Sequence, residues 1–355
     1  MLFKIFQKLK MVVFVTTIFF ICSPLIANSI LEKQSGIWVV RHNLYSKKAI
    51  DKTISTIVEL GIETIYLQVR GRGYALYHSA IEPPSPKIKD DFDPLAYFIA
   101  QAKPYNLTVH AWINTYLLWT APKDPVDVSH LYHKHPEWFE VAIKQSPYYQ
   151  TRNVYLSPHL KAVNDYLLTL IQELIRNYDL DGIHLDYIRY LDKYCGYHKK
   201  ALDQFYAIYA VPPGNLFKLI NNEFWISFKS MKVTGLVESI KKQIKKNDPD
   251  IKLSVAVKPD PNLARRDFGQ NWRLWLNRDI VDYVVIMNYA TDHYDFIKSL
   301  NIINKEFDSK NVYCGIALYN KNINTIIDQI KSAKKLGFDK IVLFSYDSII
   351  ENKWF

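Results

Sequence analysis

Short hydrophobic runs alternate with longer amphipathic segments along most of this chain. The short runs are rich in β-branched and aromatic residues and stop at turn-forming or polar residues, which is typical of buried strands. Eight such runs are present, at residues 36–40, 64–69, 108–113, 182–186, 252–257, 283–287, 312–317 and 340–344.

The segments between these runs carry hydrophobic residues three and four positions apart. In residues 162–178, for example, Val163, Leu167 and Leu170 fall on one helical face. Residues 323–336 follow the same pattern. Such segments predict amphipathic helices that pack on a sheet through one side.

Eight alternating strands and helices predict an α/β protein with the (β/α)8 TIM barrel fold. Four of the seven intervals between strand starts are close to the ~30 residues that one strand, one helix and two loops need. The intervals after the third and fourth strands are much longer, so long insertions are predicted at residues 117–157 and 191–222. Both are rich in Tyr, Trp, His and Pro, and we expect them to form the walls of a cleft.

A doubly wound open sheet is the alternative arrangement. That fold would have a glycine-rich phosphate-binding loop after its first strand. Arg41, His42 and Asn43 stand at this position. The sequence therefore predicts no dinucleotide site, and we expect no organic cofactor.

The first residues have the pattern of a secretory signal. Three lysines precede an apolar segment of roughly 11 residues, and residues 27–29 (Ala-Asn-Ser) place small side chains at alternate positions. The apolar segment is shorter than the ~20 residues that a membrane-spanning helix needs. The sequence predicts a signal peptide at residues 1–29, a barrel domain at residues 30–355, and an exported protein that is periplasmic or secreted.

Two alternatives to a cleaved signal remain. An uncleaved segment would anchor the protein to the membrane. A lipoprotein would be modified at Cys22, but Ile21 stands where a small residue is required.

The composition is that of a globular protein. The chain is 49% hydrophobic and 23% charged, with 11 Gly and 16 Pro, which excludes a disordered tail and a multi-span membrane protein. Its net charge is +10, yet no basic run alternates with aromatic residues, so no nucleic-acid partner is expected. The basic surface suits attraction to an anionic cell envelope, or ordinary solubility. Beyond the signal only Cys195 and Cys314 remain, and two thiols are expected, with one bridge as the alternative.

The fourth predicted strand carries an acid at the end where barrel enzymes hold their active sites. Side chains alternate along a strand, so His184, Asp186 and Ile188 share one face. Asp186 is the only acid of this motif that points into the barrel mouth, and it is the predicted catalytic residue. The alternative is a buried aspartate bonded to Arg189 or to a backbone amide.

Several of these strand-end motifs occur together in a known family. The chain resembles the family-10-like glycosyl hydrolases in four motifs, which are Arg70-Gly71-Arg72-Gly73 with Ala75-Leu76-Tyr77, His110-Ala111-Trp112-Ile113-Asn114, His135-Pro136-Glu137-Trp138, and residues 181–190. The resemblance runs from about Gly36 to the final strand. It implies a secreted or envelope-attached barrel protein that acts on glycan, and some members act on bacterial cell-wall glycan.

The chain departs from the family pattern at four places. The usual Asn-Pro-Tyr-Arg reads Asn-Thr-Tyr-Leu at residues 114–117, and Trp-Arg-Arg reads Trp-Ile-Ser at residues 225–227. Gln-Asp-Trp reads Gln-Asn-Trp at residues 270–272, and the proline of the sixth strand has become Ile286. The lost arginines and aspartate predict changed substrate contacts.

A more distant likeness is to the family-18 chitinases. Their fourth strand carries acids at alternating positions and ends in a catalytic Glu, where this chain has His184, Asp186 and Ile188. The complete chitinase mechanism is therefore not implied.

Glycoside hydrolysis ordinarily uses a second carboxyl group beside the proton donor. Asp260, Asp347 and Glu82 follow predicted strands at the correct end and are the candidates. If the substrate bears N-acetyl groups, its own amide oxygen could replace this carboxylate, with Asn288 and Tyr289 orienting the amide.

Further strand-end residues are predicted to bind the sugar. The predicted substrate-binding residues are Arg70, Arg72, His110, Trp112, Asn114, Tyr116, His184, Tyr187, Arg189, Asn288, Tyr289 and Tyr346. The two strand-2 arginines could instead form ion pairs that brace the barrel mouth, and Trp112 and Tyr116 could pack beneath an insertion. His130, His133 and His135 match no strong metal spacing, so no metal is expected.

The sequence thus predicts a glycoside hydrolase that cleaves an N-acetylated polysaccharide, with peptidoglycan glycan strands as the expected substrate. A glycan-binding protein without turnover, on the same barrel, is the main alternative. A glycan transferase or deacetylase is a third.

Overall fold

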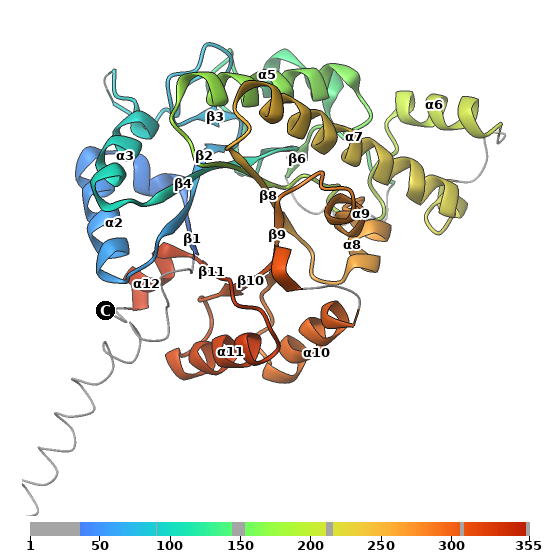
Figure 1. Ribbon diagram of the computed structural model, residues 1–355. Helices are drawn as coiled ribbons and strands as arrows, with labels where there is room; N and C mark the ends of the chain where they lie inside the picture. The colour runs from blue at the N-terminus through green and yellow to red at the C-terminus, as the bar shows by residue number, and fades with distance from the viewer. Residues whose placement is uncertain (1–35, 90, 144–152, 211–215, 306–308, 353–355) are drawn as a thin grey trace, which may run out of the picture.

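The computed structural model describes residues 36–89, 91–143, 153–210, 216–305 and 309–352. Eight parallel strands form one sheet in the order β1-β11-β10-β9-β8-β7-β4-β2, and pairing of β1 with β2 closes it into a barrel (Figure 1). The strands are β1 (Gly36–Val39), β2 (Thr64–Gly71), β4 (Thr108–Asn114), β7 (Gly182–Asp186), β8 (Lys252–Val257), β9 (Tyr283–Asn288), β10 (Val312–Ala317) and β11 (Ile341–Phe344). The predicted (β/α)8 barrel is confirmed, and the open sheet is excluded by this closure.

The predicted strand boundaries agree with these to within one or two residues. The largest difference is at β2, which continues to Gly71 because Arg70 and Gly71 pair with Ala75 and Tyr74 of the short antiparallel strand β3 (Tyr74–Ala75). The loop after β1, where a phosphate-binding turn was not expected, is the 3-10 helix η1 (Arg41–Leu44).

Helices surround the barrel on the outside (Figure 1). They are α2 (Lys47–Glu59), α3 (Pro94–Ala102), α5 (Lys161–Asn177), α7 (Glu223–Asn247), α8 (Pro261–Phe268), α9 (Trp272–Asn277), α10 (His293–Asn304), α11 (Ile323–Lys335) and α12 (Tyr346–Asn352), with the 3-10 helices η2 (Lys103–Tyr105) and η6 (Ser309–Asn311). Local sequence sets their starts: Ser46, Asp93 and Asn222, for example, accept hydrogen bonds from the backbone N–H groups of the first turn.

The barrel interior is a separate core of large rings. Trp38, Tyr66, Trp112 and Tyr283 are all less than a tenth exposed and pack together. His184 lies among them, where Trp38 Nε1 donates to its Nε2 at 3.1 Å. A second, larger core lies between the strands and the surrounding helices. The barrel is therefore a filled cylinder, and chemistry is confined to its ends.

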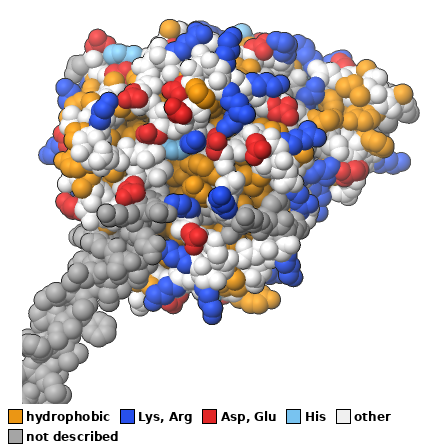
Figure 2. All heavy atoms as spheres, viewed as in Figure 1, with side chains coloured by type: hydrophobic (Ala, Val, Ile, Leu, Met, Phe, Trp, Pro, Cys, Tyr) orange, Lys and Arg blue, Asp and Glu red, His pale blue; other side chains and the backbone are white. Residues whose placement is uncertain are grey.

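The two predicted insertions are present on the C-terminal side of the strands. The first holds β5 (Leu117–Trp119), α4 (Leu131–Lys134), η3 (Pro136–Trp138) and β6 (Val154–Tyr155), and the second holds α6 (Lys199–Tyr209) and η5 (Leu216–Leu219). Helix α6 stands out from the barrel beside α7 (Figure 1), and hydrophobic side chains gather on this projection, whereas charges of both signs are spread over the rest of the face in view (Figure 2).

Three further expectations bear on the fold. Cys314 is a free, buried thiol, so the alternative of a bridge between the two remaining cysteines is not realised. The predicted signal at residues 1–29 lies outside the described residues. Within the residues that the structure does describe, no helix combines the length and hydrophobicity needed to cross a membrane.

Candidate active site

Groups from three strands converge on Asp186 at the C-terminal end of the barrel. Asp186 is the last residue of β7 and pairs in register with Asn114 of β4. Trp112 of β4 and Lys258, which follows β8, both favour the ionised form of its carboxyl and so lower its pKa. After burial, the charge of Asp186 is the next cause that raises the pKa of Tyr289, which follows β9. Because residues on or directly after the strands at both sides of β7, and directly after β9 beyond β8, interact with the same carboxyl, it faces the barrel mouth.

Asp186 is held in a largely desolvated position. It is 7% exposed, and the backbone N–H of Tyr187 donates to its Oδ1 at 2.6 Å. Tyr187 adopts a φ of 51°, which turns the chain sharply out of the strand. Burial raises the pKa of Asp186, although Arg189, the Tyr187 amide, Trp112 and Lys258 all oppose this rise. A carboxyl with a raised pKa is suited to donate a proton near neutral pH.

Arg189 and Lys258 place two cations beside this carboxyl. The Arg189 guanidinium lies 4.9 Å from the Tyr187 ring centre and 5.5 Å from the Phe268 ring centre. The Lys258 Nζ lies 5.1 Å from the same Phe268 ring. Burial, followed by the charge of Arg189, lowers the pKa of Lys258 to about 8, and Asp186 partly restores it. Sequence reasoning missed Lys258, although its place directly after the fifth predicted strand is a usable signal.

The departure from the Gln-Asp-Trp motif concerns the support of Lys258. Gln270 accepts a hydrogen bond from the Lys258 backbone N–H at 3.1 Å, and Trp272 Nε1 donates to the Lys258 carbonyl at 3.0 Å. Between them, Asn271 caps α9 by accepting from the Leu274 N–H. Asparagine and aspartate cap helices about equally well. This change therefore leaves the support of Lys258 in place.

Two of the lost family arginines stood at positions that are buried in this chain. Leu117, which replaces the family arginine, is 4% exposed and pairs with Tyr155. Ile226 is likewise 4% exposed in α7, and Ser227 accepts a hydrogen bond from Arg265 Nη2 at 2.9 Å. The two lost arginines at residues 117 and 226 are therefore replaced by core packing.

Aromatic rings border the site on the side of β9 and β11. Tyr289 stacks on Phe344 with ring centres 5.4 Å apart and planes 25° apart. Tyr319, which is 40% exposed, meets both rings edge-on. Trp112 closes the inner side, and its ring meets that of Phe344 edge-on with the centres 6.4 Å apart. Such flat, partly polar surfaces suit the faces of sugar rings.

The three candidates for a second carboxylate have different environments. Glu82 is buried and forms an ion pair with Arg70 at 2.6 Å, and Asp260 caps α8. Asp347 keeps a side chain that is 20% exposed, and His42 and Asn43 bond to its Oδ1 at 2.6 and 2.9 Å. Burial alone would raise the pKa of Asp347, but the bonds from His42 and Asn43 outweigh it and lower the pKa. Asp347 is thus a partly exposed acid whose hydrogen bonds favour the ionised form.

Several predicted substrate-binding residues are used by the fold instead. Arg70 is 1% exposed and donates to Glu82 and to the carbonyls of Asn114 and Thr115, so the alternative of a bracing ion pair holds. His110 and His184 lie inside the barrel, and burial lowers the pKa of His110 to about 4.

Some of the remaining predicted residues form hydrogen bonds or packing contacts that support the fold, and others border the site. Tyr116 donates to Asn164, Asn288 donates to the Phe296 carbonyl, and Tyr346 is buried in the outer core. Asn114 accepts from Gln68. Arg72 remains half-buried at the rim, where its Nε donates to Thr120 at 2.7 Å. The site therefore retains Asp186, Trp112, Tyr187, Arg189, Tyr289 and Arg72 from the predicted residues.

The histidines of the first insertion have separate partners. His130 bonds to the Arg72 carbonyl, His133 to the Pro125 carbonyl and His135 to Glu137. Across the described part of the chain, no group of three His, Cys, Asp or Glu residues is arranged to hold a metal ion.

The chain is similar to several known proteins. The model of the family described as Glycosyl hydrolase-like 10 matches residues 33–335. Glycosyl hydrolase YngK of Bacillus subtilis is 25% identical over 307 residues, which cover 76% of this chain and 57% of YngK. Glycosyl hydrolase DigH of Escherichia coli K12 is 27% identical over 165 residues, which cover 41% of this chain and 35% of DigH. The chain thus spans little more than half of YngK and about a third of DigH.

Solved structures share the fold. The glycoside hydrolase domain of PgaB (BpsB) from Bordetella bronchiseptica superposes with a TM-score of 0.71 at 14% identity, covering 90% of this chain and 95% of that domain. The catalytic domain of a β-amylase from Paenibacillus polymyxa gives 0.63 at 11% identity, covering 90% and 94%. The family match extends over most of the barrel, and the predicted resemblance is confirmed: the chain belongs to the glycosyl hydrolase-like 10 family.

Proposed function

We propose that this protein is a glycoside hydrolase that cleaves an N-acetylated polysaccharide, with the glycan strands of bacterial peptidoglycan as substrate. Membership of the family supports action on a glycan. The observation that carries the proposal is the contrast between two acids at one end of the barrel. Burial raises the pKa of Asp186, whereas hydrogen bonds hold that of Asp347 low. Separated pKa values of this kind identify a proton donor and an ionised partner.

In the proposed reaction, Asp186 donates its proton to the glycosidic oxygen as the bond to the leaving sugar breaks. Asp347 is the proposed second carboxylate, and an N-acetyl oxygen of the substrate is the alternative. Asn288 cannot orient that amide because its own side chain is bonded to the Phe296 carbonyl, so Tyr289 is the remaining candidate. The rings of Tyr289, Tyr319 and Phe344 would stack on the bound sugars.

The test uses the purified protein on defined peptidoglycan glycan strands and on neutral N-acetylglucosamine oligomers, with products identified by mass spectrometry. Cleavage that is abolished by Asp186→Asn supports the proposal. An Asp186→Asn protein that still hydrolyses at the wild-type rate removes its basis.

A glycan-binding protein without turnover is the second candidate. Ile188, which stands where the chitinases have their catalytic Glu, is fully buried in the core, and Asp186 itself is mostly buried. Binding of strands by calorimetry, with no product over a range of pH, would favour this candidate.

Export is proposed from the sequence alone. The basic and apolar pattern of residues 1–29 supports a cleaved signal and a periplasmic or secreted protein. Fractionation of cells, with N-terminal sequencing of the protein recovered, tests both the location and the cleavage site.

A further inference from the structure

Two cations share one aromatic ring in the barrel mouth. Arg189 follows β7 and Lys258 follows β8, and each lies over Phe268, at 5.5 and 5.1 Å from its centre. Arg189 is only 7% exposed, and Lys258 is half-buried. Like charges repel strongly when they are removed from water, so such a pair is costly unless an anion lies between them.

No acid of the described residues is paired directly with either cation. Neither cation forms an ion pair within 4.0 Å of an acid in the part of the chain that the structure describes, which sets this pair apart from Arg70 and Lys241. Arg189 Nη1 donates to the Tyr190 carbonyl at 3.3 Å, but its buried Nε has no hydrogen-bond partner among the residues that the structure describes. Asp186 acts on both cations, but its carboxyl forms no ion pair within 4.0 Å with either and is the proposed proton donor.

The rest of the rim is also basic. Arg72 and Arg41 lie close enough for Arg41 to lower the pKa of Arg72, after the larger effect of burial. The charge of Arg41 also lowers the pKa of Tyr187, against the larger effect of burial, which raises it. Arg41 and Arg72 donate to the neutral groups of Gln68 and Thr120. The other acids at this end have partners of their own: Asp347 bonds to His42 and Asn43, Asp260 caps α8, and Glu82 pairs with Arg70.

We propose that Arg189 and Lys258 bind a carboxylate carried by a sugar of the glycan substrate, next to the bond that Asp186 protonates. This inference rests on the proposed function and specifies its substrate as an acidic glycan. Arginine donors with a free Nε–H match a carboxylate, and lysine adds a point charge. The hydrogen bonds from Gln270 and Trp272 to the Lys258 backbone fix the position of this residue.

The test compares three probes: strands of alternating N-acetylglucosamine and N-acetylmuramic acid with free lactyl carboxylates, the same strands with each carboxyl converted to a methylamide, and N-acetylglucosamine oligomers. Dissociation constants are measured by calorimetry, separately from cleavage. We expect the wild type to bind the carboxylated strands about tenfold more tightly than the amidated ones, because charged hydrogen bonds are lost on amidation. Lys258→Met, which keeps an unbranched side chain of similar length without the charge, should remove most of that preference and leave binding of the neutral oligomers within about twofold.

Two further variants make the result specific. Lys258→Arg should retain the preference, and Lys245→Met, at an exposed position in the last turn of α7, should behave as the wild type. Equal binding of carboxylated and amidated strands by the wild type overturns the inference even if both are cleaved. A charge preference that depends on Lys258 but comes with no cleavage supports the inference while overturning the proposed hydrolase activity.

Discussion

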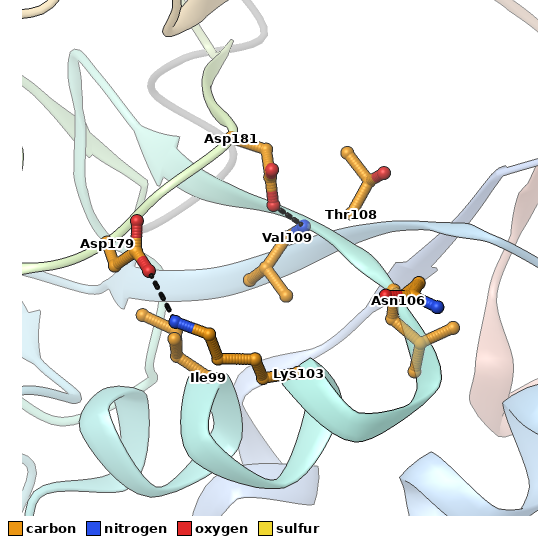
Figure 3. Close-up of a pocket in the computed structure, with 8 residues that line it drawn as sticks. Ile99, Lys103, Asn106, Thr108, Val109, Asp179 and Asp181 are labelled. Atoms are coloured by element: carbon orange, nitrogen blue, oxygen red, sulfur yellow. Dashed lines mark hydrogen bonds and ion pairs between the residues drawn. The ribbon is translucent and has the colours of Figure 1, made fainter.

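Charged side chains at the two ends of this barrel differ in whether they have a partner within the folded chain. At the N-terminal end, Asp181 Oδ2 accepts from the Val109 N–H at 2.7 Å, and Lys103 pairs with Asp179 at 3.3 Å, beside a pocket of about 300 Å³ (Figure 3). Asp282 likewise accepts from Lys241 and from the Leu253 N–H.

At the C-terminal end, by contrast, Asp186, Arg189 and Lys258 have no ion pair among the described residues. Burial there shifts the pKa of Asp186 and Lys258 toward the neutral forms. A group that already has its partner in the folded chain stabilises the fold, whereas one that lacks a partner is available to a ligand. The comparison places stability at one end of the barrel and chemistry at the other.

The largest effect is expected from Asp186→Asn. The amide cannot donate a proton to the leaving oxygen, so kcat on glycan strands should fall by about 100-fold or more, with the midpoint of thermal unfolding little changed. Asp181→Asn is the matched control at the opposite end and should keep kcat. Loss of activity in the Asp181 variant alone would reverse the assignment of the two ends.

Glu82→Gln tests the exception at the C-terminal end, where Arg70 and Glu82 form a fully paired, buried couple. The variant leaves the Arg70 charge buried without a counter-ion, so the free energy of unfolding should fall by about 3–5 kcal/mol. Chemical denaturation measures this. A cost below about 1 kcal/mol would show that Glu82 is not structural and return it to the list of candidate catalytic acids.

The barrel interior between the two ends should make stability depend on pH. Burial lowers the pKa of His110 to about 4 from an ordinary 6.5, because the charged form is excluded from the core. The unfolded chain therefore takes up a proton at higher pH than the folded one. Stability should fall as the pH drops from about 6.5 to about 4, by up to roughly 3 kcal/mol. Denaturation curves of His110→Gln across this range should lack this component of the slope.

The fold could be predicted almost completely from the sequence, because strand and helix periodicity is repeated eight times along the chain. The site could be predicted only in part. Strand parity identified Asp186, but parity also selected His110 and His184, which lie too deep in the barrel to reach a ligand. Depth along a barrel axis depends on how neighbouring strands are staggered, and hydrophobic patterning does not encode that stagger. The placement of Arg189 and Lys258 beside Phe268 joins the segments after β7 and β8 with the end of α8, and it has no local signal.

Asp181→Ala should have a smaller effect than these. It removes the acceptor for the Val109 N–H, and a lost hydrogen bond to a charged group costs about 1.5–3 kcal/mol when buried and less at this exposed position. We expect a loss of about 1 kcal/mol in the free energy of unfolding and unchanged kinetics. A changed KM would link the N-terminal end to the substrate and weaken the comparison.

The smallest effect is expected at Asn271, where restoring the family residue by Asn271→Asp exchanges one good helix cap for another. Stability should change by less than about 0.5 kcal/mol, whereas Asn271→Ala should cost about 1 kcal/mol. Activity should follow the same order, since the cap acts on catalysis only through the backbone that holds Lys258. If Asn271→Asp instead raises kcat severalfold with stability unchanged, the carboxylate of the family motif takes part in the reaction. The site of this chain would then lack one acid that the family motif supplies.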